Sequence, residues 1–437
     1  MKWNARWRGV GRWSIWFVVT GLVLGAAWPR AEWRLLSSRL INSQAVERLG
    51  LGGYFVFDLV DTTKRMWKRS RLAKVDVQPY REFLRSHTAR VRNPVRPAPT
   101  KQKHVVYLQL ESIDGLMIGG RKNGQSTMPY LESLAEKHVY FTNVLDCTAT
   151  GRTTDGEFLV LTSQVPVARP PVYVSQQLDR IPSLPRVLNE AGYHTQSMHG
   201  FNGVFWHRAE AHAALGYDEM SFEDDLDLAE KIGWGWSDAA VLQAAADRLI
   251  ASEEPAFLHV ITLTNHHPYD YIAQHQGEEP GTIEEEFLRS VAYVDDAIKG
   301  FMERLDSAGV LDDCLIVIYS DHDSAIDVEM EAHLDSFYPR LISDTVPLIM
   351  IGFDRAPQRV DAIVGLQDVP VMVLEELGIP APLTFLGNGW DKWGRTYSAS
   401  HAGWQMAGDV VAPWGWPVDA ETLTRLAINY PEKLLEP

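Results

Sequence analysis

Short apolar runs alternate with longer amphipathic stretches through most of the chain, and their order predicts the architecture of its main body. The apolar runs predict strands at 105–110, 194–198, 256–264, 315–319 and 346–351. The stretches with helical spacing predict helices at 128–137, 184–191 and 284–305. Near-continuous apolar strands separated by helices are typical of a sheet that is buried on both faces. The pattern therefore predicts an α/β fold with a mostly parallel central sheet flanked by helices.

Polar side chains follow four of these strands, in each case at the carboxyl end of the strand. They are Glu111, His199, His266 and the pair Asp321 and His322. In open α/β sheets, ligands bind in the crevice outside the carboxyl ends of the strands. Each of these residues alone is equally consistent with a capping or solvated side chain. Their occurrence at four separate strand ends predicts that they share one site.

A polar stretch from Asp146 to Glu157 is rich in hydroxyl groups and glycine, and the apolar run 158–162 follows it directly. Such a stretch is typical of a loop that leads into the N-terminus of a helix. There, unpaired backbone N–H groups and the helix dipole favour an alkoxide or a bound anion. Thr153 and Thr154 are therefore candidate nucleophiles. The alternative is that either of them serves only as the N-cap.

Glu111, Asp321, His322 and a threonine hydroxyl together offer three oxygen ligands and one nitrogen ligand. This set suits Mn²⁺, Mg²⁺ or Zn²⁺ better than a soft metal ion. A divalent cation beside the hydroxyl would lower its pKa and activate it as a nucleophile. We therefore expect one divalent metal ion at this edge of the sheet.

Four further residues are candidates for holding an anionic substrate at the same edge. His199 and His266 can donate hydrogen bonds to phosphoryl or sulfuryl oxygens. Arg208 can bind such a group through two parallel hydrogen bonds, and Trp206 can form an apolar wall. The alternatives are a surface ion pair for Arg208 and plain core packing for Trp206.

Composition narrows the classes of partner. The chain has 437 residues, of which 46% are hydrophobic, so it can bury a large core. Its formal charge of −16 argues against a nucleic-acid partner, because there is no basic excess to neutralise phosphates. The two cysteines, Cys147 and Cys314, form neither a disulfide framework nor a zinc-ligand spacing.

The N-terminal sequence predicts that the main body is exported. Basic residues precede an uncharged run from Trp13 to Pro29, which has tryptophans near both ends. We expect residues 1–30 to form a single-pass anchor in the cytoplasmic membrane, with the rest of the chain on its outer side. The alternative is a signal peptide that is cleaved after export.

Residues 31–100 are predicted to connect this segment to the catalytic domain. They are helical and partly amphipathic at first, and the basic cluster at 64–71 suits either anionic lipid headgroups or a solvated helix face. Three prolines within 91–100 then predict an extended linker. We expect the catalytic domain at 101–400 and a C-terminal tail packed on it at 401–437, with His401 as an ordinary surface residue.

Five segments of the chain occur in the same order as in lipoteichoic-acid synthases. They are Val105–Ser112, Gly151–Glu157, His199 with Phe205–Arg208, Thr264–Tyr269 and Tyr319–His322. As an ordered set they make the chain resemble this family, which is the sulfatase-like branch of the alkaline phosphatase superfamily and includes phosphoglycerol transferases. The resemblance implies an alkaline phosphatase-like fold.

The resemblance also implies a site and a reaction. The family's metal ligands, usually for Mn²⁺, match Glu111, Thr153, Asp321 and His322, with Thr153 as the catalytic threonine. The residues that hold the phosphoglycerol head group match His199, Trp206, Arg208 and His266. In the family reaction the threonine takes this group from phosphatidylglycerol, diacylglycerol leaves, and the group passes to a hydroxyl of an envelope glycan or glycolipid.

Three features depart from the family pattern. The synthases usually carry five membrane helices, whereas this chain offers one at most. A glycine and a phosphate-contacting serine usually follow the Asp-His pair, whereas here the run is Asp323–Ile326, which leaves the head-group contacts open. The tail from Thr384 onward has no family counterpart.

Other functions on the same fold remain as alternatives. A sulfatase is disfavoured because Cys147 lacks the Ser-Arg context from which formylglycine is made. A phosphoethanolamine transferase is disfavoured because those enzymes typically carry several disulfides. A non-catalytic envelope-binding protein is disfavoured by the intact set of nucleophile and ligands. A phosphodiesterase stays open, because transfer to water leaves no residue signature.

Overall fold

The computed structural model describes residues 42–99, 101–167, 170–326, 328, 330, 345–392, 405–407, 410–412 and 418–435. The predicted membrane anchor at residues 1–30 and the side chain of His401 lie outside these ranges. Within them, no helix is both long enough and apolar enough to cross a membrane. The chain divides into two compact units, Met1–Asp76 and Val77–Pro437.

The described part of the first unit is a long helix, α3 (Asn42–Leu72). It is interrupted at Gly50, whose φ of 66° lies outside the helical range. Phe57 is buried against Leu49 and Tyr54. Trp67 is more than half exposed, and so are four further apolar residues, namely Leu51, Phe55, Leu59 and Met66. Because they are four or seven residues apart, they lie along one side of the helix.

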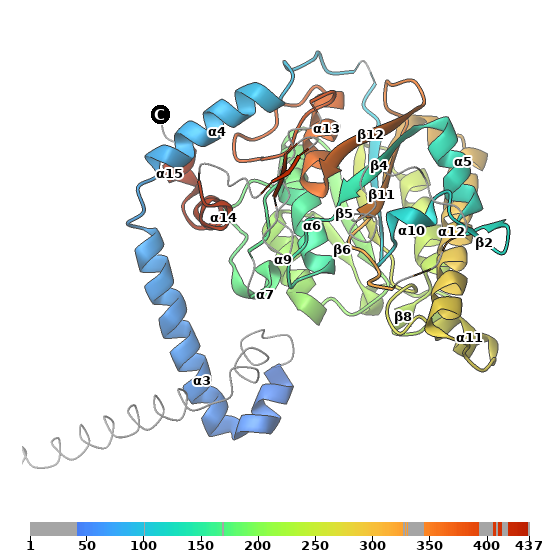
Figure 1. The fold of residues 1–437 in the computed structure, drawn as a ribbon, viewed down its shortest axis with the longest axis horizontal. Coiled ribbons are helices and arrows are strands. Elements are labelled where there is room, and N and C mark those ends of the chain that lie inside the picture. The colour runs from blue at the N-terminus through green and yellow to red at the C-terminus, as the bar shows by residue number, and fades with distance from the viewer. Residues whose placement is uncertain are drawn as a thin grey trace, which may run out of the picture. The chain divides into compact units, whose positions relative to one another are not determined.

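An eight-stranded sheet forms the centre of the second unit in the described part of the chain (Figure 1). Its strands are β1 (His104–Leu110), β4 (Val139–Leu145), β5 (His194–His199), β6 (Glu219–Ser221), β9 (Ala256–Ile261), β10 (Cys314–Ser320), β11 (Thr345–Ile351) and β12 (Gln358–Gly365). They lie side by side in the order β12-β4-β11-β10-β1-β9-β5-β6. β11 is antiparallel to both of its neighbours, and the other neighbouring pairs are parallel. The predicted mostly parallel sheet is confirmed.

Helices cover both faces of this sheet (Figure 1). One face carries α5 (Pro129–Lys137), α10 (Asp238–Ala251) and α12 (Ile283–Ser307). The other carries α6 (Thr153–Thr162), α8 (Leu184–Glu190), α9 (Arg208–Leu215) and α13 (Val369–Glu376). Smaller elements are α4 (Gln78–Val91), α7 (Val172–Ser175), α11 (Tyr271–Gln276), α14 (Ala420–Asn429), α15 (Pro431–Leu435), the 3-10 helix η2 (Phe205–His207), and the hairpins β2–β3 (Arg121–Lys122 with Gln125–Ser126), β7–β8 (Lys231–Ile232 with Gly235–Trp236) and β13–β14 (Gln405–Ala407 with Val410–Ala412).

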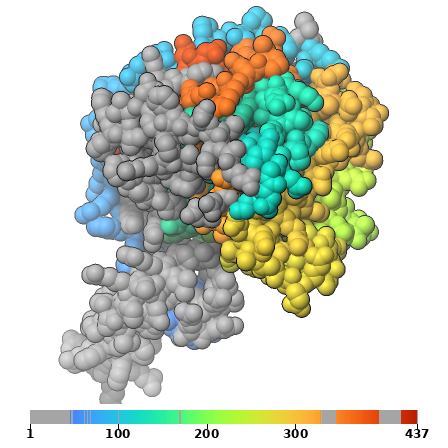
Figure 2. Space-filling view, turned by 45° about the vertical axis from the view of Figure 1, so that its right-hand side comes forward, coloured from blue at the N-terminus to red at the C-terminus, as the bar shows by residue number. Residues whose placement is uncertain are grey.

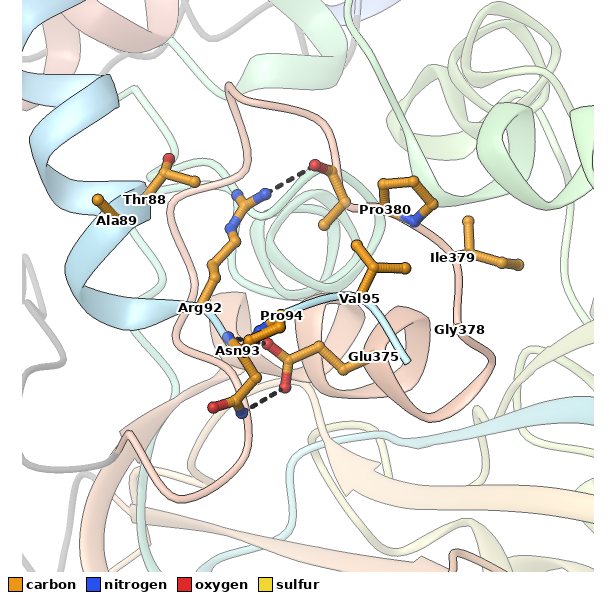
Figure 3. A pocket seen from close by; sticks show the side chains of 11 residues that line it. Thr88, Ala89, Arg92, Asn93, Pro94, Val95, Glu375, Gly378, Ile379 and Pro380 are labelled. Atoms are coloured by element: carbon orange, nitrogen blue, oxygen red, sulfur yellow. Dashed lines mark hydrogen bonds between the residues drawn. The ribbon is translucent and has the colours of Figure 1, made fainter. Parts of the chain in front are cut away.

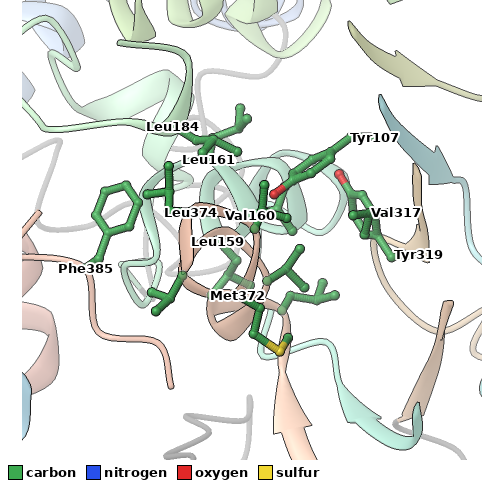
Figure 4. Packing of buried hydrophobic residues seen from close by; sticks show 14 of the residues in the cluster. Tyr107, Leu159, Val160, Leu161, Leu184, Val317, Tyr319, Met372, Leu374 and Phe385 are labelled. Carbon is green, nitrogen blue, oxygen red and sulfur yellow. The ribbon is translucent and has the colours of Figure 1, made fainter. Parts of the chain in front are cut away.

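The alternation of side chains along each strand divides the core into two layers. Val105 and Tyr107 of β1 belong to the layer that contains α6, α8 and α13, part of which is seen in Figure 4. Val106 and Leu108 belong to the layer on the opposite face, with α10 and α12. Every residue of α6 is buried. This is why the run 158–162 is continuously apolar rather than amphipathic.

The sequence of α12 explains why this helix forms where it does. The Thr282 hydroxyl accepts a hydrogen bond from the Glu285 backbone N–H, and the Glu285 carboxylate accepts the Thr282 backbone N–H. On its buried side, Asp295 accepts the backbone N–H groups of Tyr130 and Leu131 at the start of α5, both at 2.8 Å. The space-filling view shows the teal segment that contains α5 adjoining the yellow segment of α11 and α12 (Figure 2). These contacts fix α5 and α12 on the same face of the sheet.

Within the second unit, polar contacts join the end of α4 and the proline-rich segment after it to α13 and the loop that follows α13 (Figure 3). The Arg92 guanidinium donates to the backbone oxygens of Ala381, at 2.7 Å, and Phe385. Asn93 donates two hydrogen bonds to the Glu375 carboxylate, each of 2.9 Å. They border a hollow of about 360 Å³ between the end of α4 and the loop after α13. The first residues of the extended segment are therefore held against the C-terminal end of α13 and the loop after it.

Candidate metal and nucleophile site

The ends of β1 and β10 and the start of α6 bring four of the predicted residues together. Glu111 follows β1, Asp321 and His322 follow β10, and Thr153 is the first residue of α6. One ligand atom from each of Glu111, Asp321 and His322 lies within 4.8 Å of the others, and all three side chains are buried. The Thr153 hydroxyl lies 3.3 Å from a Glu111 oxygen and 3.4 Å from His322 Nε2. The four predicted ligands therefore form one cluster.

The charges of this cluster fit a divalent cation. Burial raises the pKa of Asp321 to about 7, and burial together with Asp321 raises the pKa of Glu111. One Asp321 oxygen is held by the backbone N–H groups of Ser112 and His322, at 3.0 and 2.8 Å. A bound cation would offset the repulsion between the two buried carboxylates. Two carboxylates, one imidazole and one hydroxyl are a donor set that suits Mn²⁺, Mg²⁺ or Zn²⁺.

The ring of His322 turns its Nε2 toward the other three candidate ligands, with Nε2 3.4 Å from the Thr153 hydroxyl and 3.5 Å from a Glu111 oxygen. Its Nδ1 lies 2.8 Å from the Asp323 backbone oxygen and 3.0 Å from Arg152 Nη2. A cation bound at Nε2 would use the lone pair of that nitrogen, with the ring proton on Nδ1 donated to the Asp323 oxygen. Burial lowers the pKa of His322, although Glu111 acts in the opposite direction, so the ring is neutral.

Two features place Thr153 beside the ligands. The Asp155 carboxylate accepts the backbone N–H groups of Ala149 and Gly151, at 2.9 and 2.8 Å, and so closes the loop before α6. Gly156, one turn into the helix, lies against Asp321. A Cβ added at Gly156 would lie 2.8 Å from both the Cβ and the backbone oxygen of Asp321. Glycine therefore allows α6 to approach the end of β10 closely enough for Thr153 to reach the cluster.

The capping alternative for the two threonines is wrong, because the N-cap residue of α6 is Arg152, with a φ of 44°. Arg152 also forms an ion pair of 2.8 Å with Asp323. The Thr154 hydroxyl donates to the Gly151 backbone oxygen at 3.1 Å, within the loop. Of the two candidate nucleophiles, only Thr153 therefore has its hydroxyl among the ligands.

Arg208, at the start of α9, is buried with Glu157 of α6, so the surface alternative for Arg208 is wrong. Its Nε and Nη2 donate to Glu157 Oε1 at 3.0 and 2.9 Å. His212 Nε2 lies 2.7 Å from the other Glu157 oxygen. Burial alone would raise the pKa of Glu157, but Arg208 and His212 outweigh it and hold this pKa well below its ordinary value. Glu157 is therefore an ionised partner of Arg208.

His199, at the end of β5, is also buried and neutral. Burial, followed by the charge of Arg208, lowers the pKa of His199 to about 3. Its Nδ1 lies 2.9 Å from the Ile261 backbone oxygen, to which it donates its proton. Nε2 then carries the lone pair of the ring and can accept a hydrogen bond from a ligand. This differs from the expectation that His199 donates to a phosphoryl oxygen.

Trp206 and His266 belong to a group of aromatic side chains drawn from three segments. The ring of Phe205 lies 5.9 Å from that of Trp206 and 5.9 Å from that of Trp234, in the β7–β8 turn. The Trp234 ring lies 4.2 Å from the His266 ring. None of these rings is fully buried, so the core alternative for Trp206 is wrong. His266 acts to lower the pKa of Glu111, which places this group within electrostatic reach of the cluster.

Sequence reasoning gave no role to three residues that shape the site, namely Arg152, Gly156 and Glu157. All three lie in the same short stretch as Thr153. For Glu157 a signal was present, because a residue four positions after Thr153 lies on the same side of the helix. A charged residue in an otherwise apolar helix is also a sign of a buried partner.

The sequence model of the sulfatases matches residues 103–379. The chain belongs to the sulfatase family. Among curated relatives, this sulfatase-family chain is 27% identical to lipoteichoic acid synthase 1 of Bacillus subtilis over 299 residues, which cover 66% of the chain and 47% of that protein. It is 25% identical to lipoteichoic acid synthase of Staphylococcus aureus over 303 residues, which cover 66% and 46%. The chain thus matches about half the length of these relatives.

Two solved structures resemble this sulfatase-family chain in fold. The lipoteichoic acid synthase LtaP from Listeria monocytogenes has a TM-score of 0.65 and 20% identity, and the match covers 81% of this chain and 96% of LtaP. A protein of the alkaline phosphatase superfamily from Vibrio parahaemolyticus has a TM-score of 0.64 and 22% identity, with coverages of 82% and 97%. The predicted alkaline phosphatase-like fold is confirmed.

Proposed function

We propose that this protein is a metal-dependent phosphoglycerol-type transferase with Thr153 as its nucleophile. The observation that carries the proposal is the position of the Thr153 hydroxyl, which lies at the first residue of α6 and within 3.4 Å of both Glu111 and His322. The similarity to lipoteichoic acid synthases supports phosphatidylglycerol as the donor and an envelope glycan or glycolipid as the acceptor.

The proposed reaction has two displacement steps at phosphorus. Thr153 Oγ1 loses its proton and attacks the phosphorus of phosphatidylglycerol, the bond from phosphorus to the diacylglycerol oxygen breaks, and diacylglycerol leaves after taking up a proton. The acceptor hydroxyl then loses its proton and attacks the phosphorus of the phosphoglycerol-threonine, the bond from phosphorus to Thr153 Oγ1 breaks, and Oγ1 takes up a proton. The positive end of the α6 dipole favours the negative oxygens in both steps.

Glu111, Thr153, Asp321 and His322 would hold one divalent cation, which we propose to be Mn²⁺. When bound, this cation would lower the pKa of the Thr153 hydroxyl and offset the charge of the phosphoryl oxygens. The same donors suit Mg²⁺ and Zn²⁺. Reconstitution of metal-free protein with each ion distinguishes them.

Four residues are proposed to bind the phosphoglycerol head group, namely His199, Trp206, Arg208 and His266. Arg208 is suited to a phosphoryl oxygen, because its Nη1 is buried and has no hydrogen-bond partner among the described residues. His199 Nε2 is suited to accept a hydrogen bond from a hydroxyl of the glycerol. Trp206 and His266 are suited to contact the phosphoglycerol head group through the set of aromatic rings that they form with Phe205 and Trp234.

We further propose that the catalytic unit works on the outer side of the cytoplasmic membrane, anchored through residues 1–30. The exposed apolar side of α3, with Leu51, Phe55, Leu59 and Met66, supports this placement, because such a side is stabilised at a lipid interface. The basic cluster at 64–71 suits anionic headgroups.

The proposal is tested with the full chain, Mn²⁺ and vesicles that contain phosphatidylglycerol. A transferase releases diacylglycerol and places phosphoglycerol on an added glycolipid acceptor, and Thr153→Ala abolishes both. If free glycerol phosphate is released and an added acceptor does not reduce its amount, the result would instead support a phosphodiesterase. Absence of diacylglycerol release with any of the three metal ions would contradict the proposal.

A further inference from the structure

We propose that Glu157 and His212 are positioning residues that orient Arg208 toward the phosphoryl group bound at Thr153. This inference rests on the proposed function, because it assumes that a phosphoryl group is the substrate part at this place. It assigns a role to two buried residues that lie outside the set of ligands and head-group residues. Both act through Arg208 and neither is proposed to contact the substrate.

The Arg208 guanidinium is held on one side only. Its Nε and Nη2 donate to Glu157 Oε1, and Nε also lies 3.3 Å from Oε2. The side chains of Arg208 and Glu157 are 2% and 0% exposed, so water does not compete for these hydrogen bonds. Nη1 is buried and has no partner among the described residues. A buried guanidinium nitrogen needs an acceptor, and a phosphoryl oxygen of a bound substrate would supply one here.

His212 fixes Glu157 in turn. Burial lowers the pKa of His212 even though Glu157 raises it, so the ring is neutral. Its Nε2 donates to Glu157 Oε2 at 2.7 Å, and its Nδ1 accepts from the Ser197 hydroxyl at 3.0 Å. The Glu157 carboxylate therefore has both oxygens held and cannot rotate without breaking buried hydrogen bonds.

The helix α6 connects this arrangement to the nucleophile. Glu157 is four residues after Thr153 and lies on the same side of the helix, one turn away, which is roughly 6 Å along its axis. The carboxylate that holds Arg208 and the hydroxyl that attacks phosphorus therefore stand on one rigid element. A phosphoryl group at Thr153 would lie about one helical turn from the carboxylate that holds Arg208. Displacing Arg208 by an ångström is expected to cost much of the rate.

Two substitutions test the role of Glu157. Glu157→Gln removes the charge and keeps the size, whereas Glu157→Asp keeps the charge and draws Arg208 away from the site. Glu132→Gln is the matched control. Glu132, on α5, also pairs with an arginine, because its two oxygens accept hydrogen bonds of 3.0 and 2.7 Å from the two Nη atoms of Arg121. The measurements are kcat/KM for phosphatidylglycerol vesicles with Mn²⁺, the Kd of sn-glycerol-1-phosphate, and the melting temperature.

We expect both Glu157 variants to lower kcat/KM by about 10- to 100-fold and to raise the Kd of sn-glycerol-1-phosphate, while Glu132→Gln changes neither. In the Arg208→Ala background, Glu157→Gln should lower kcat/KM by less than about twofold further, because both act through one guanidinium. A merely structural role would lower the melting temperature and leave the Kd unchanged.

Each outcome decides the inference. If Glu157→Gln does not fold, Glu157→Asp alone carries the test, because it keeps the buried charge pair. Wild-type Kd and kcat/KM in Glu157→Asp would overturn the inference, as would independent losses that multiply in the double variant. Failure of the proposed function is separate, since it appears as absence of diacylglycerol release by the unmodified protein. The inference then stands or falls on the Kd of sn-glycerol-1-phosphate.

Discussion

Gly156 of α6 lies against Asp321 at the end of β10, so closely that a methyl group in place of its hydrogen would lie 2.8 Å from the Asp321 backbone oxygen. Because that atom belongs to the backbone, the overlap cannot be relieved by a side-chain rotation. The close approach of α6 to Asp321 thus depends on the absence of a side chain at position 156.

Gly156→Ala is therefore expected to push α6 away from β10, destabilise the protein by about 1–3 kcal/mol and lower its affinity for Mn²⁺. Urea unfolding and calorimetric titration measure the two effects. Gly300→Ala in α12 is the control, because a Cβ there meets nothing within 4 Å and alanine is the better helix former. Unchanged metal affinity in Gly156→Ala would contradict the geometric argument.

Thr153→Ala is expected to lower turnover by at least about 10³-fold with little change in melting temperature, because it removes the attacking oxygen. Thr154→Ala is the neighbouring control. It removes the hydrogen bond to the Gly151 oxygen and costs about 1 kcal/mol of stability, but it leaves the nucleophile in place. If Thr154→Ala abolished turnover and Thr153→Ala retained it, the nucleophile would be Thr154.

Asp321→Asn is expected to weaken Mn²⁺ binding by more than about 100-fold, because it removes the charge of a ligand whose one oxygen is already fixed by two backbone N–H groups. Chelation should abolish the activity of the unmodified protein, and added Mn²⁺ should restore it. Asp361→Asn, on the exposed side of β12, serves as the control carboxylate. Activity that survives exhaustive chelation would remove the metal ion from the account.

The stability of the fold is expected to fall below about pH 6.5, in part through His259. Burial lowers the pKa of His259 from 6.5 to about 3. As the pH falls through this window, the unfolded chain binds a proton at His259 and the folded chain does not. The free energy of unfolding therefore falls by about 1.4 kcal/mol per pH unit from this group alone. Stability is retained above pH 6.5.

His259→Gln tests this assignment. Gln can still bond with Tyr217 and Tyr319, which His259 contacts at 2.9 and 3.1 Å. Urea unfolding at pH 7, 6 and 5 should give a smaller loss of stability in the variant than in the unmodified protein. Equal losses would show that His259 is not the titrating group.

Much of the fold and the ligand cluster could be predicted from local sequence. Glu111, Asp321 and His322 each follow a continuous apolar run directly, and the carboxyl ends of parallel strands meet at one edge. The strands β4, β6 and β12 of the sheet were missed, and β6 has only three residues. Thr142 and Asn143 interrupt the apolar pattern of β4, and Arg359 and Asp361 make β12, at the edge of the sheet, read as a polar segment.

Other features depend on contacts between distant parts of the chain. The antiparallel direction of β11 is set by how the chain returns to the sheet, and its apolar sequence is the same in either direction. The local sequence around Arg208 likewise does not show whether its ion pair is buried or exposed. Only the packing of α9 against α6 places Arg208 on Glu157. The tautomer of His199 is decided by the Ile261 oxygen on a neighbouring strand.

The central claim is that the Thr153 hydroxyl attacks phosphorus, and peptide-level mass spectrometry tests it most directly. The full chain is incubated with phosphatidylglycerol vesicles and Mn²⁺ in the absence of an acceptor, quenched in acid and digested. We expect the peptide that contains Thr153 to gain the mass of one phosphoglycerol group, with the fragment ions placing it on Thr153, and we expect no such gain in Thr153→Ala. Diacylglycerol release without an adduct, or an adduct on Thr154, would contradict the account.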